Sequence, residues 1–380
     1  MDFSLSKEQQ LIQRAAQEYA EKFIEPISQQ IDEENQVPDE ILKGLGELDM
    51  FGIPYDDEYG GAGAGYASYV LAMEQIGKAS SGVAMIISAH TLGLGAINAF
   101  GTEEQKKKYM TKGCKGEHIV SFAFTEPGTG SDPKQITTTA VREGDYFILN
   151  GTKRFISNAG FPGPVVVFAR ETENGKISAF IVEKFCEGYS VSEPWKKGGM
   201  HGGPLLDIYL KDVKVPAENM LAPSGMGYQV LQFGISFGKV GVCSTALGGV
   251  LAAMEESFKY AREKTHRDAP IAKFQAVQLK LAQIAELYEA CKWMTYRLGW
   301  LADRVKDPVQ FAKDAALTKD YVCQQLVEIT SLAVSVHGSY GLMRDYKVER
   351  LWRDSIVGLQ IEGVSDMQKM IVAGVMLGSK

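Results

Sequence analysis

The sequence predicts an α+β protein in which two helical domains flank a smaller β domain. Apolar residues recur every three or four positions toward both ends of the chain, which is the period of an amphipathic helix. Short β-rich runs separated by turn signals fill the middle. Strands and helices do not alternate, and no GxGxxG motif follows a strand, so a nicotinamide-binding Rossmann fold is not expected. We place the three domains at 1–118, 119–222 and 223–380.

The first zone begins with a helix-start signal. Ser6 and Gln9 fit a capping box, in which each side chain bonds the backbone N–H of the other residue. Apolar or small residues then follow at helical spacing over 11–23. Pro38, followed by two acidic residues, opens the next helix. The turn-rich stretch 54–63 breaks the pattern, so we expect several helices joined by one conspicuous loop.

The second zone changes its period from helix to strand. Turn signals at 143–145 and 174–175 separate β-rich runs. The segment 210–216 alternates apolar and polar residues and stops at a proline. The runs themselves are Tyr146-Phe147-Ile148-Leu149, Val165-Val166-Val167-Phe168 and Ser178-Ala179-Phe180-Ile181-Val182. This pattern predicts a middle domain built as a β-barrel or sandwich.

The third zone returns to long helices. A core stripe steps by three or four residues, as helix–helix packing requires. Its members are Val277, Leu281, Ile284, Tyr288, Cys291, Met294 and Leu298. Asp307-Pro308 starts a further helix, 338–341 interrupts the zone, and a last helix fills most of 363–378. We expect a four-helix-bundle-type domain.

Composition excludes several classes of protein. The 380 residues carry 40 Lys+Arg against 47 Asp+Glu, a net charge of −7, which argues against binding nucleic acid. No apolar run approaches the ~18–20 residues that a membrane helix needs. Five scattered cysteines without a CxxC pair indicate reduced thiols and no metal site. The N-terminus lacks the basic start of a secretion signal, so we expect a cytoplasmic protein.

Two segments of the middle zone are candidates for a ligand site. In 122–132, Gly128 and Gly130 allow close approach of the backbone to a ligand, and nearby hydroxyls can donate to it. In 150–160, Phe155 could lie against a flat ring while Ser157 donates to a ring nitrogen. An ordinary turn and a hairpin with a core phenylalanine remain the alternative interpretations.

The third candidate is 360–366, where Glu362 stands beside a glycine among apolar neighbours at the start of the last helix. Desolvation would raise the pKa of this carboxyl and make it a usable general base. The alternative is an acid stabilised by the dipole at the N-terminus of the helix.

Taken together, these segments resemble the acyl-CoA dehydrogenase family of flavoproteins over the whole chain. The family signature Phe-Thr-Glu-Pro-Gly-x-Gly-Ser-Asp stands intact at 124–132. Residues 212–221 are similar to the ending of its middle domain, D-V-x-V-P-x-x-N-x-L. Arg353-Asp354 and the later Ile361-Glu362-Gly363 match its C-terminal block. The resemblance implies a helical, β, helical subunit that binds FAD and assembles as a homotetramer, with part of the ADP half of FAD touching a neighbouring subunit.

The resemblance also implies the reaction, the α,β-dehydrogenation of an acyl-CoA thioester. Glu362 would take the α proton while a hydride leaves the β carbon for flavin N5. The backbone N–H of Glu362 and a ribityl hydroxyl of FAD would bond the thioester oxygen. Reduced flavin would pass electrons to an electron-transfer flavoprotein, within fatty or carboxylic acid metabolism.

Further site residues follow from the same resemblance. Thr125 and Ser157 would bond the flavin ring, and Phe155, where many members have Trp, would cover one face of it. The implied cofactor residues are Phe122, Phe124, Thr125, Gly130, Ser131, Phe155, Ile156, Ser157, Lys264, Gln275, Gly338, Val364 and Asp366. The implied substrate residues are Ser131, Ser236, Lys239 and Gly363.

Several positions depart from the family pattern. Lys264 stands where an arginine is usual, and 267–268 reads Arg-Asp instead of Phe-Gly. The segment 335–341 lacks a glutamine and one glycine of the usual ADP-binding block. Residues 236–239 replace an Asp-x-x-Arg pattern that helps to hold CoA, and Val364 replaces a threonine. A lysine keeps the charge but loses the planar fork that grips a pyrophosphate.

These departures leave alternatives open. FAD could be held by altered contacts, or a different subunit could complete its site in a heteromer. A carrier-protein thioester could replace free CoA as the substrate. The chemistry could also run backwards, as an enoyl-CoA reductase, because the same groups serve both directions.

Overall fold

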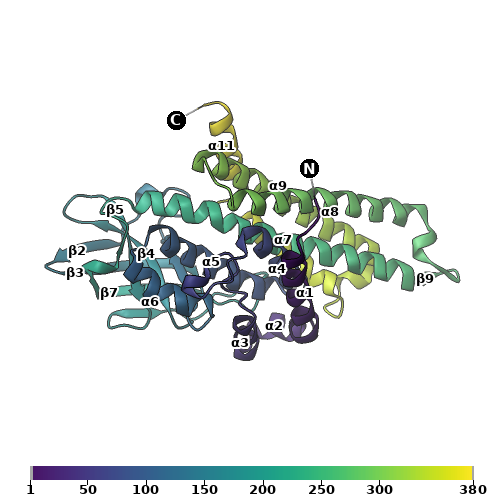
Figure 1. Cartoon of the computed structure of the whole chain (residues 1–380). Helices are drawn as coiled ribbons and strands as arrows, with labels where there is room; N and C mark the ends of the chain where they lie inside the picture. Colours follow the sequence, from purple (N-terminus) through teal and green to yellow (C-terminus); the bar gives the residue numbers. More distant parts are fainter. Residues whose placement is uncertain (1–2, 379–380) are drawn as a thin grey trace.

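The computed structural model describes residues 3–378, and helices make up its N-terminal region (Figure 1). The predicted capping box is present, with Ser6 Oγ accepting from the Gln9 N–H at 3.1 Å and Gln9 Oε1 accepting from the Ser6 N–H at 3.0 Å. The helices of this region are α1 (Lys7–Tyr19), α2 (Ser28–Glu34), α3 (Asp39–Glu47), α4 (Gly65–Ala79), α5 (Ser81–Phe100) and α6 (Glu103–Cys114).

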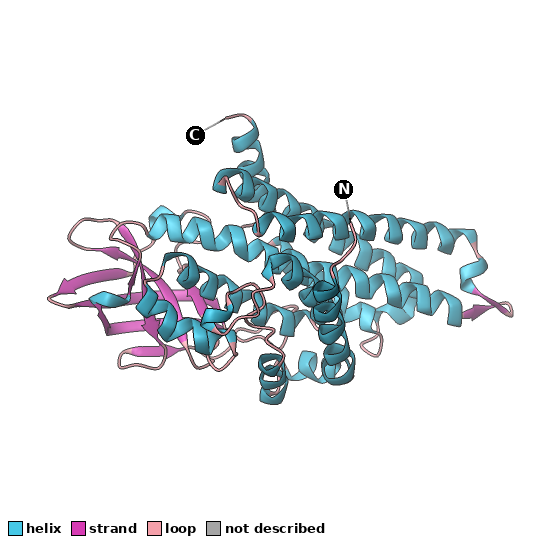
Figure 2. Ribbon diagram, viewed as in Figure 1, coloured by secondary structure: helices cyan, strands magenta, loops and turns pink. Residues whose placement is uncertain are grey.

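A mixed β-sheet forms the middle region and gathers at one end of the molecule (Figure 2). Its strands are β1 (Ser121–Ala123), β2 (Thr139–Glu143), β3 (Tyr146–Ser157), β4 (Pro164–Glu171), β5 (Ile177–Glu183), β6 (Tyr189–Val191), β7 (Leu205–Pro216) and β8 (Met220–Leu221). They follow the order β6-β7-β3-β2-β4-β5-β8, and β1 adds to β4. β1 and β2 run parallel to β4, and the other neighbours are antiparallel.

Long helices return after the sheet. They are α7 (Gly227–Glu263), α8 (Gln275–Ala302), α9 (Pro308–His337), α10 (Lys347–Ser355) and α11 (Ser365–Met376). α7 packs against both α8 and α9 and also against α4 and α5, so it is the central helix of the molecule. The predicted stripe on α8 faces inward, with Leu281, Ile284, Cys291 and Leu298 buried. The α+β organisation predicted from the sequence is confirmed.

A small hairpin at the far end of the bundle was not predicted. It consists of β9 (Thr265–His266) and β10 (Ala269–Pro270), and its turn residues Arg267 and Asp268 adopt φ values of 49° and 62°. α7 connects the sheet to this hairpin, and its 37 residues span about 55 Å at 1.5 Å each. The hairpin and the sheet therefore lie at opposite ends of the molecule (Figure 1).

The sequence has no continuous apolar run of membrane-spanning length, yet two helices reach the length and mean hydropathy of a membrane span. They are α5 and α7, whose aliphatic and alanine residues raise the mean hydropathy although glycines and polar residues interrupt them. However, 72% of the apolar window of α5 and 89% of that of α7 lie buried within the protein. Both are therefore core helices.

Candidate active site

Glu362 lies in a tight turn between α10 and α11. It adopts φ = 49°, which is unusual for a residue with a side chain, and Gly363 follows at φ = 91°. Gln368 Nε2 donates to the carbonyl of Glu362 at 3.1 Å and to that of Gly363 at 2.8 Å. Lys319 Nζ, from α9, also donates to the Gly363 carbonyl at 2.8 Å. The turn is therefore fixed by two helices, and it aims the carboxylate inward.

The carboxylate of Glu362 is desolvated. Part of the residue reaches the surface, but Oε2 is buried and has no hydrogen-bond partner among the described residues. Burial raises the pKa of Glu362 to about 7, against the opposing attraction of Lys239 and Lys319. Burial likewise lowers the pKa of Lys239 to about 8, although Glu362 opposes that shift. The site thus holds a carboxyl that can gain or lose a proton near neutral pH.

Gly238 on α7 makes room for this carboxylate. A Cβ at this position would lie 2.6 Å from Glu362 Oε2, closer than van der Waals contact allows. The glycine therefore exposes bare helix backbone to the functional group.

A second group of candidate residues lies at the β3 edge of the sheet. The β3–β7 pairing shifts register between Lys153 and Ile156, and Phe155 within this bulge adopts φ = 58°. Its ring is half exposed and lies 5.3 Å from that of Trp195 in an edge-on arrangement. The bulge therefore leaves the faces of two aromatic rings partly open to a ligand.

Asp207 holds this bulge in place. Its Oδ1 accepts from Trp195 Nε1 at 2.9 Å and from the Phe155 N–H at 3.3 Å, while Oδ2 accepts from Arg154 Nε at 3.1 Å. These bonds lower the pKa of Asp207 despite the opposing effect of burial. The sequence did not indicate Asp207, because its partners lie about 12 and 50 residues away.

The neighbouring loop 124–132 is pinned by a buried ion pair. Lys153 Nζ donates to Glu126 Oε1 at 2.7 Å, and both side chains are at most 2% exposed. Glu126 also accepts from the N–H groups of Thr137 and Thr138 at 2.6 and 3.0 Å. Burial would raise the pKa of Glu126, but Lys153 and these donors hold it at about 2. The glutamate of the signature is thus structural, and a lysine within a buried strand is the signal that could have revealed it.

Thr125 and Ser157 lie close to Phe155 along the backbone, since Ser157 ends β3 and Thr125 pairs with Arg154. Neither hydroxyl makes a hydrogen bond within the part of the chain that the structure describes. The backbone around them is nevertheless fixed, because the Thr125 carbonyl accepts from the Arg154 N–H at 2.8 Å. The donor set of this edge, two hydroxyls without partners in the described chain and two partly exposed aromatic rings, fits the chemistry of a planar ring system with polar edges, such as a flavin.

The other residues predicted near this edge are divided between the core and the surface. Phe122 packs against Phe168 with ring centroids 4.9 Å apart, and Phe124 and Ile156 are buried. Gly130 and Ser131 are exposed. On the helical side, Ser236 is buried and its Oγ donates to the Gln232 carbonyl, while Val364 and Asp366 begin α11.

Lys264, Gln275 and Gly338, the residues predicted for the ADP half, lie at the hairpin end of the bundle. Lys264 directly follows α7, and its Nζ lies 4.6 Å from the centroid of the Tyr340 ring. The two ADP-binding segments that depart from the family pattern, 264–268 and 335–341, therefore contact each other. About 55 Å of α7 separates this end from the sheet, so one chain cannot offer both groups of residues to the same small molecule.

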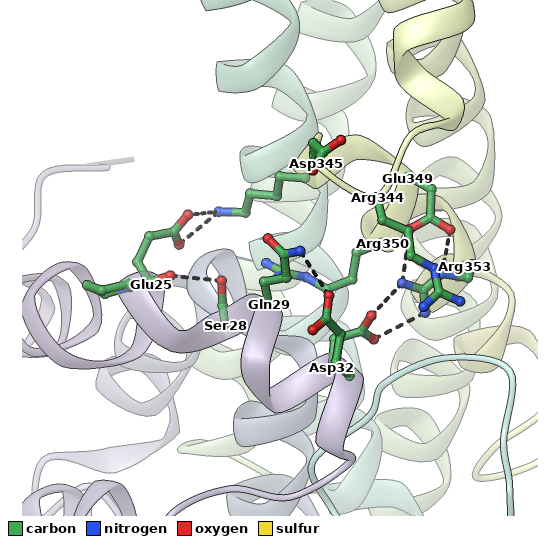
Figure 3. Close-up of a pocket in the computed structure, with 12 residues that line it drawn as sticks. Glu25, Ser28, Gln29, Asp32, Arg344, Asp345, Glu349, Arg350 and Arg353 are labelled. Atoms are coloured by element: carbon green, nitrogen blue, oxygen red, sulfur yellow. Dashed lines mark hydrogen bonds and ion pairs between the residues drawn. The ribbon is translucent and has the colours of Figure 1, made fainter.

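A polar cavity of about 170 Å³ lies elsewhere, between α2 and α10 (Figure 3). Ion pairs line it: Arg353 bonds Asp32 at 2.6 Å and Glu349 at 2.7 Å, and Lys347 bonds Glu25 at 2.7 Å. These pairs join the N-terminal helices to the C-terminal bundle. Because these ion pairs tie α2 and its preceding turn to α10, we interpret the cavity as part of the contact between the two regions.

The described chain thus carries a buried carboxyl whose pKa lies near neutrality and, apart from it, an edge of the sheet with partly exposed aromatic rings. Models of the acyl-CoA dehydrogenase N-terminal, middle and C-terminal domains match residues 6–117, 121–213 and 225–377. The chain therefore belongs to the acyl-CoA dehydrogenase family, which binds FAD and acts on CH–CH groups.

Relatives match over nearly the full length. The chain is 39% identical to a 3-(aryl)acrylate reductase of Clostridium sporogenes, covering 98% of this chain and 99% of the relative. It is 36% identical to the CarC subunit of the caffeyl-CoA reductase–Etf complex of Acetobacterium woodii, with the same coverage. The structure of butyryl-CoA dehydrogenase from Megasphaera elsdenii superposes with a TM-score of 0.96 at 32% identity, covering 99% and 100% of the two chains.

Proposed function

We propose that Glu362 is the acid–base residue of this acyl-CoA dehydrogenase. The observation that carries the proposal is the buried Oε2 of Glu362, which has no hydrogen-bond partner in the described chain. Burial raises the pKa of this carboxyl to about 7, and the nearby buried lysines Lys239 and Lys319 limit the rise. A pKa near the working pH gives a base that is ionised often enough to accept a proton and basic enough to hold it. The α carbon of a bound acyl thioester would take the place of the missing partner.

Bound FAD supplies the hydride acceptor for the β carbon. The residues of this chain position the reaction around that acceptor. Phe155 and Trp195 offer a face for the ring, and Thr125 and Ser157 offer hydroxyls to its polar edge. The Glu362 N–H would donate to the thioester oxygen as negative charge develops there. Lys239 and Lys319 keep the carboxyl from becoming too basic to ionise at neutral pH.

We propose a homotetramer in which Lys264, Gln275 and Gly338 serve the cofactor of a neighbouring subunit. The separation of the two ends of α7 supports this arrangement. A heteromer with a different subunit stays the alternative. The native mass of protein that contains this chain alone and has bound flavin distinguishes them, because a homotetramer has four times the mass of one chain. We further propose a cytoplasmic location, supported by five free cysteines, four of which are buried.

The reductive direction is a second candidate function. Two of the relatives above are named as reductases, and a carboxyl with a pKa of about 7 can return a proton to the α carbon as readily as remove it. The redox potential of the flavin with product bound, compared with that of the electron-transfer flavoprotein, decides the direction.

The test is anaerobic titration of the purified protein with saturated and α,β-unsaturated acyl-CoA thioesters, followed by the flavin absorbance. Glu362→Gln should keep its flavin but lose exchange of the α proton with solvent. Glu173→Gln, an exposed change in a turn of the sheet, is the matched control and should behave as the wild type. Normal proton exchange in Glu362→Gln would refute the assignment of the base.

A further inference from the structure

Three buried hydroxyls without partners lie together near the proposed base. They belong to Tyr69 on α4 and to Ser88 and Thr91 on α5. None of the three has a partner within the described chain that meets full hydrogen-bond geometry, although Ser88 and Thr91 each interact weakly with the Tyr69 hydroxyl. Ser88 and Thr91 are nevertheless close enough to Tyr69 to counter, in part, the rise that burial causes in the pKa of its phenol.

The hydroxyls of Tyr69 and Ser88 face the same side of α7 as the carboxylate of Glu362. A Cβ at Gly241 would lie 2.9 Å from Tyr69 Oη and in even closer contact with Ser88 Oγ. A Cβ at Gly238 would lie 2.6 Å from Glu362 Oε2. The two glycines are three residues apart and share one helix face, so the hydroxyls lie about 5 Å further along α7 than the carboxylate.

Leaving these groups unpaired is costly, because a buried hydroxyl gives up its bonds to water on folding. Native proteins satisfy nearly all such groups, and the exceptions need an explanation. Glu362 Oε2 is unpaired in the same region, so three such polar atoms, those of Tyr69, Ser88 and Glu362, border one face of α7, and Thr91 lies beside Tyr69. A ligand that reaches the carboxylate with its α carbon would extend toward the hydroxyls.

The chemistry of the cluster limits what that ligand carries. Hydroxyls can donate and accept hydrogen bonds but bring no charge, so they suit a neutral polar group better than a carboxylate. The wall beside them is aromatic: the Tyr66 ring lies 5.9 Å from that of Tyr69 and 5.3 Å from that of Phe237. The surroundings therefore combine an apolar face with a neutral hydrogen-bonding end.

We propose that Tyr69, Ser88 and Thr91 bind a hydroxyl or carbonyl group carried by the acyl chain of the substrate at its γ or δ carbon. The proposal rests on the function proposed above, because it places the α carbon at Glu362. The expected substrates are therefore short acyl thioesters whose acyl chain ends in a polar group. Sites built to bond a substrate hydroxyl discriminate strongly against the analogue that lacks it, since their own groups are then left unpaired.

The test compares substrates that differ only in this group: butyryl-CoA with 4-hydroxybutyryl-CoA, and crotonyl-CoA with 4-hydroxycrotonyl-CoA for the reductive direction. In the wild type, kcat/KM should favour the hydroxylated member of each pair by about tenfold to a hundredfold. Tyr69→Phe and Thr91→Val remove a hydroxyl while keeping the shape, and each should reduce that preference at least severalfold. Tyr209→Phe, an exposed position on β7, is the matched control and should keep it.

The outcomes separate this proposal from the one on which it rests. Equal kcat/KM for both members of each pair, unaltered in Tyr69→Phe and Thr91→Val, would overturn the polar-terminus site and leave the dehydrogenase function intact. Failure of every thioester to change the flavin spectrum would overturn the function itself. If Tyr69→Phe does not fold, Thr91→Val and Ser88→Ala give the same comparison.

Discussion

Replacing Glu362 by glutamine should stabilise the fold at neutral and higher pH. Burial raises the pKa of Glu362 from the ordinary 4.5 to about 7. A group whose folded pKa exceeds its unfolded pKa contributes stability that is complete below pH 4.5 and is lost as pH rises through 7. The difference corresponds to about 3 kcal/mol. Glutamine resembles the protonated acid and does not titrate, so the variant avoids this loss.

The assay is the thermal unfolding midpoint of both proteins with saturating FAD, measured by circular dichroism at intervals from pH 4.5 to 7.5. The midpoint of Glu362→Gln should equal that of the wild type at the acid end and exceed it by a widening margin toward pH 7.5. Glu173→Gln, which changes an exposed carboxyl, should show no such divergence. A margin that stays constant or shrinks as pH rises would refute the claim that the carboxyl is destabilised by its surroundings.

Three other substitutions test the site. Lys239→Met removes a positive charge that holds down the pKa of Glu362, so the acid limb of the kcat/KM profile for dehydrogenation should move upward by about one to two pH units; an unmoved limb would contradict the electrostatic coupling. Gly238→Ala places a methyl group 2.6 Å from the Glu362 carboxylate and should lower kcat by about 10²-fold with flavin retained, whereas normal turnover would show that the turn can yield. Lys153→Met removes the positive charge beside the buried Glu126 carboxylate and should lower the free energy of unfolding in urea by about 3–5 kcal/mol. A loss below about 1 kcal/mol would mean that water reaches the carboxylate.

The helical and β regions could be predicted because their signals are local. The Ser6 capping box and the apolar stripe of α8 depend on spacings of three or four residues, and both are present. The burial of Glu362 could be expected for the same reason, since its apolar and glycine neighbours adjoin it in sequence.

The features that the sequence did not reveal depend on contacts between distant segments. Lys153 pairs with Glu126 across 27 residues, and Lys319 reaches the Gly363 carbonyl across 44. The bulge that turns Phe155 outward arises from the register between β3 and β7, which no short motif encodes. The contact between the Tyr69 and Ser88 side chains depends on how α4 and α5 pack against α7.

The length of α7 has a consequence for how the protein retains its cofactor. In the arrangement proposed above, the sheet of one chain and the hairpin of another hold one cofactor, which is then bound fully only while the subunits are associated. Cofactor retention then obeys mass action and depends on protein concentration. Dilution would release flavin before any chain unfolds, and added FAD would draw free subunits back into the oligomer.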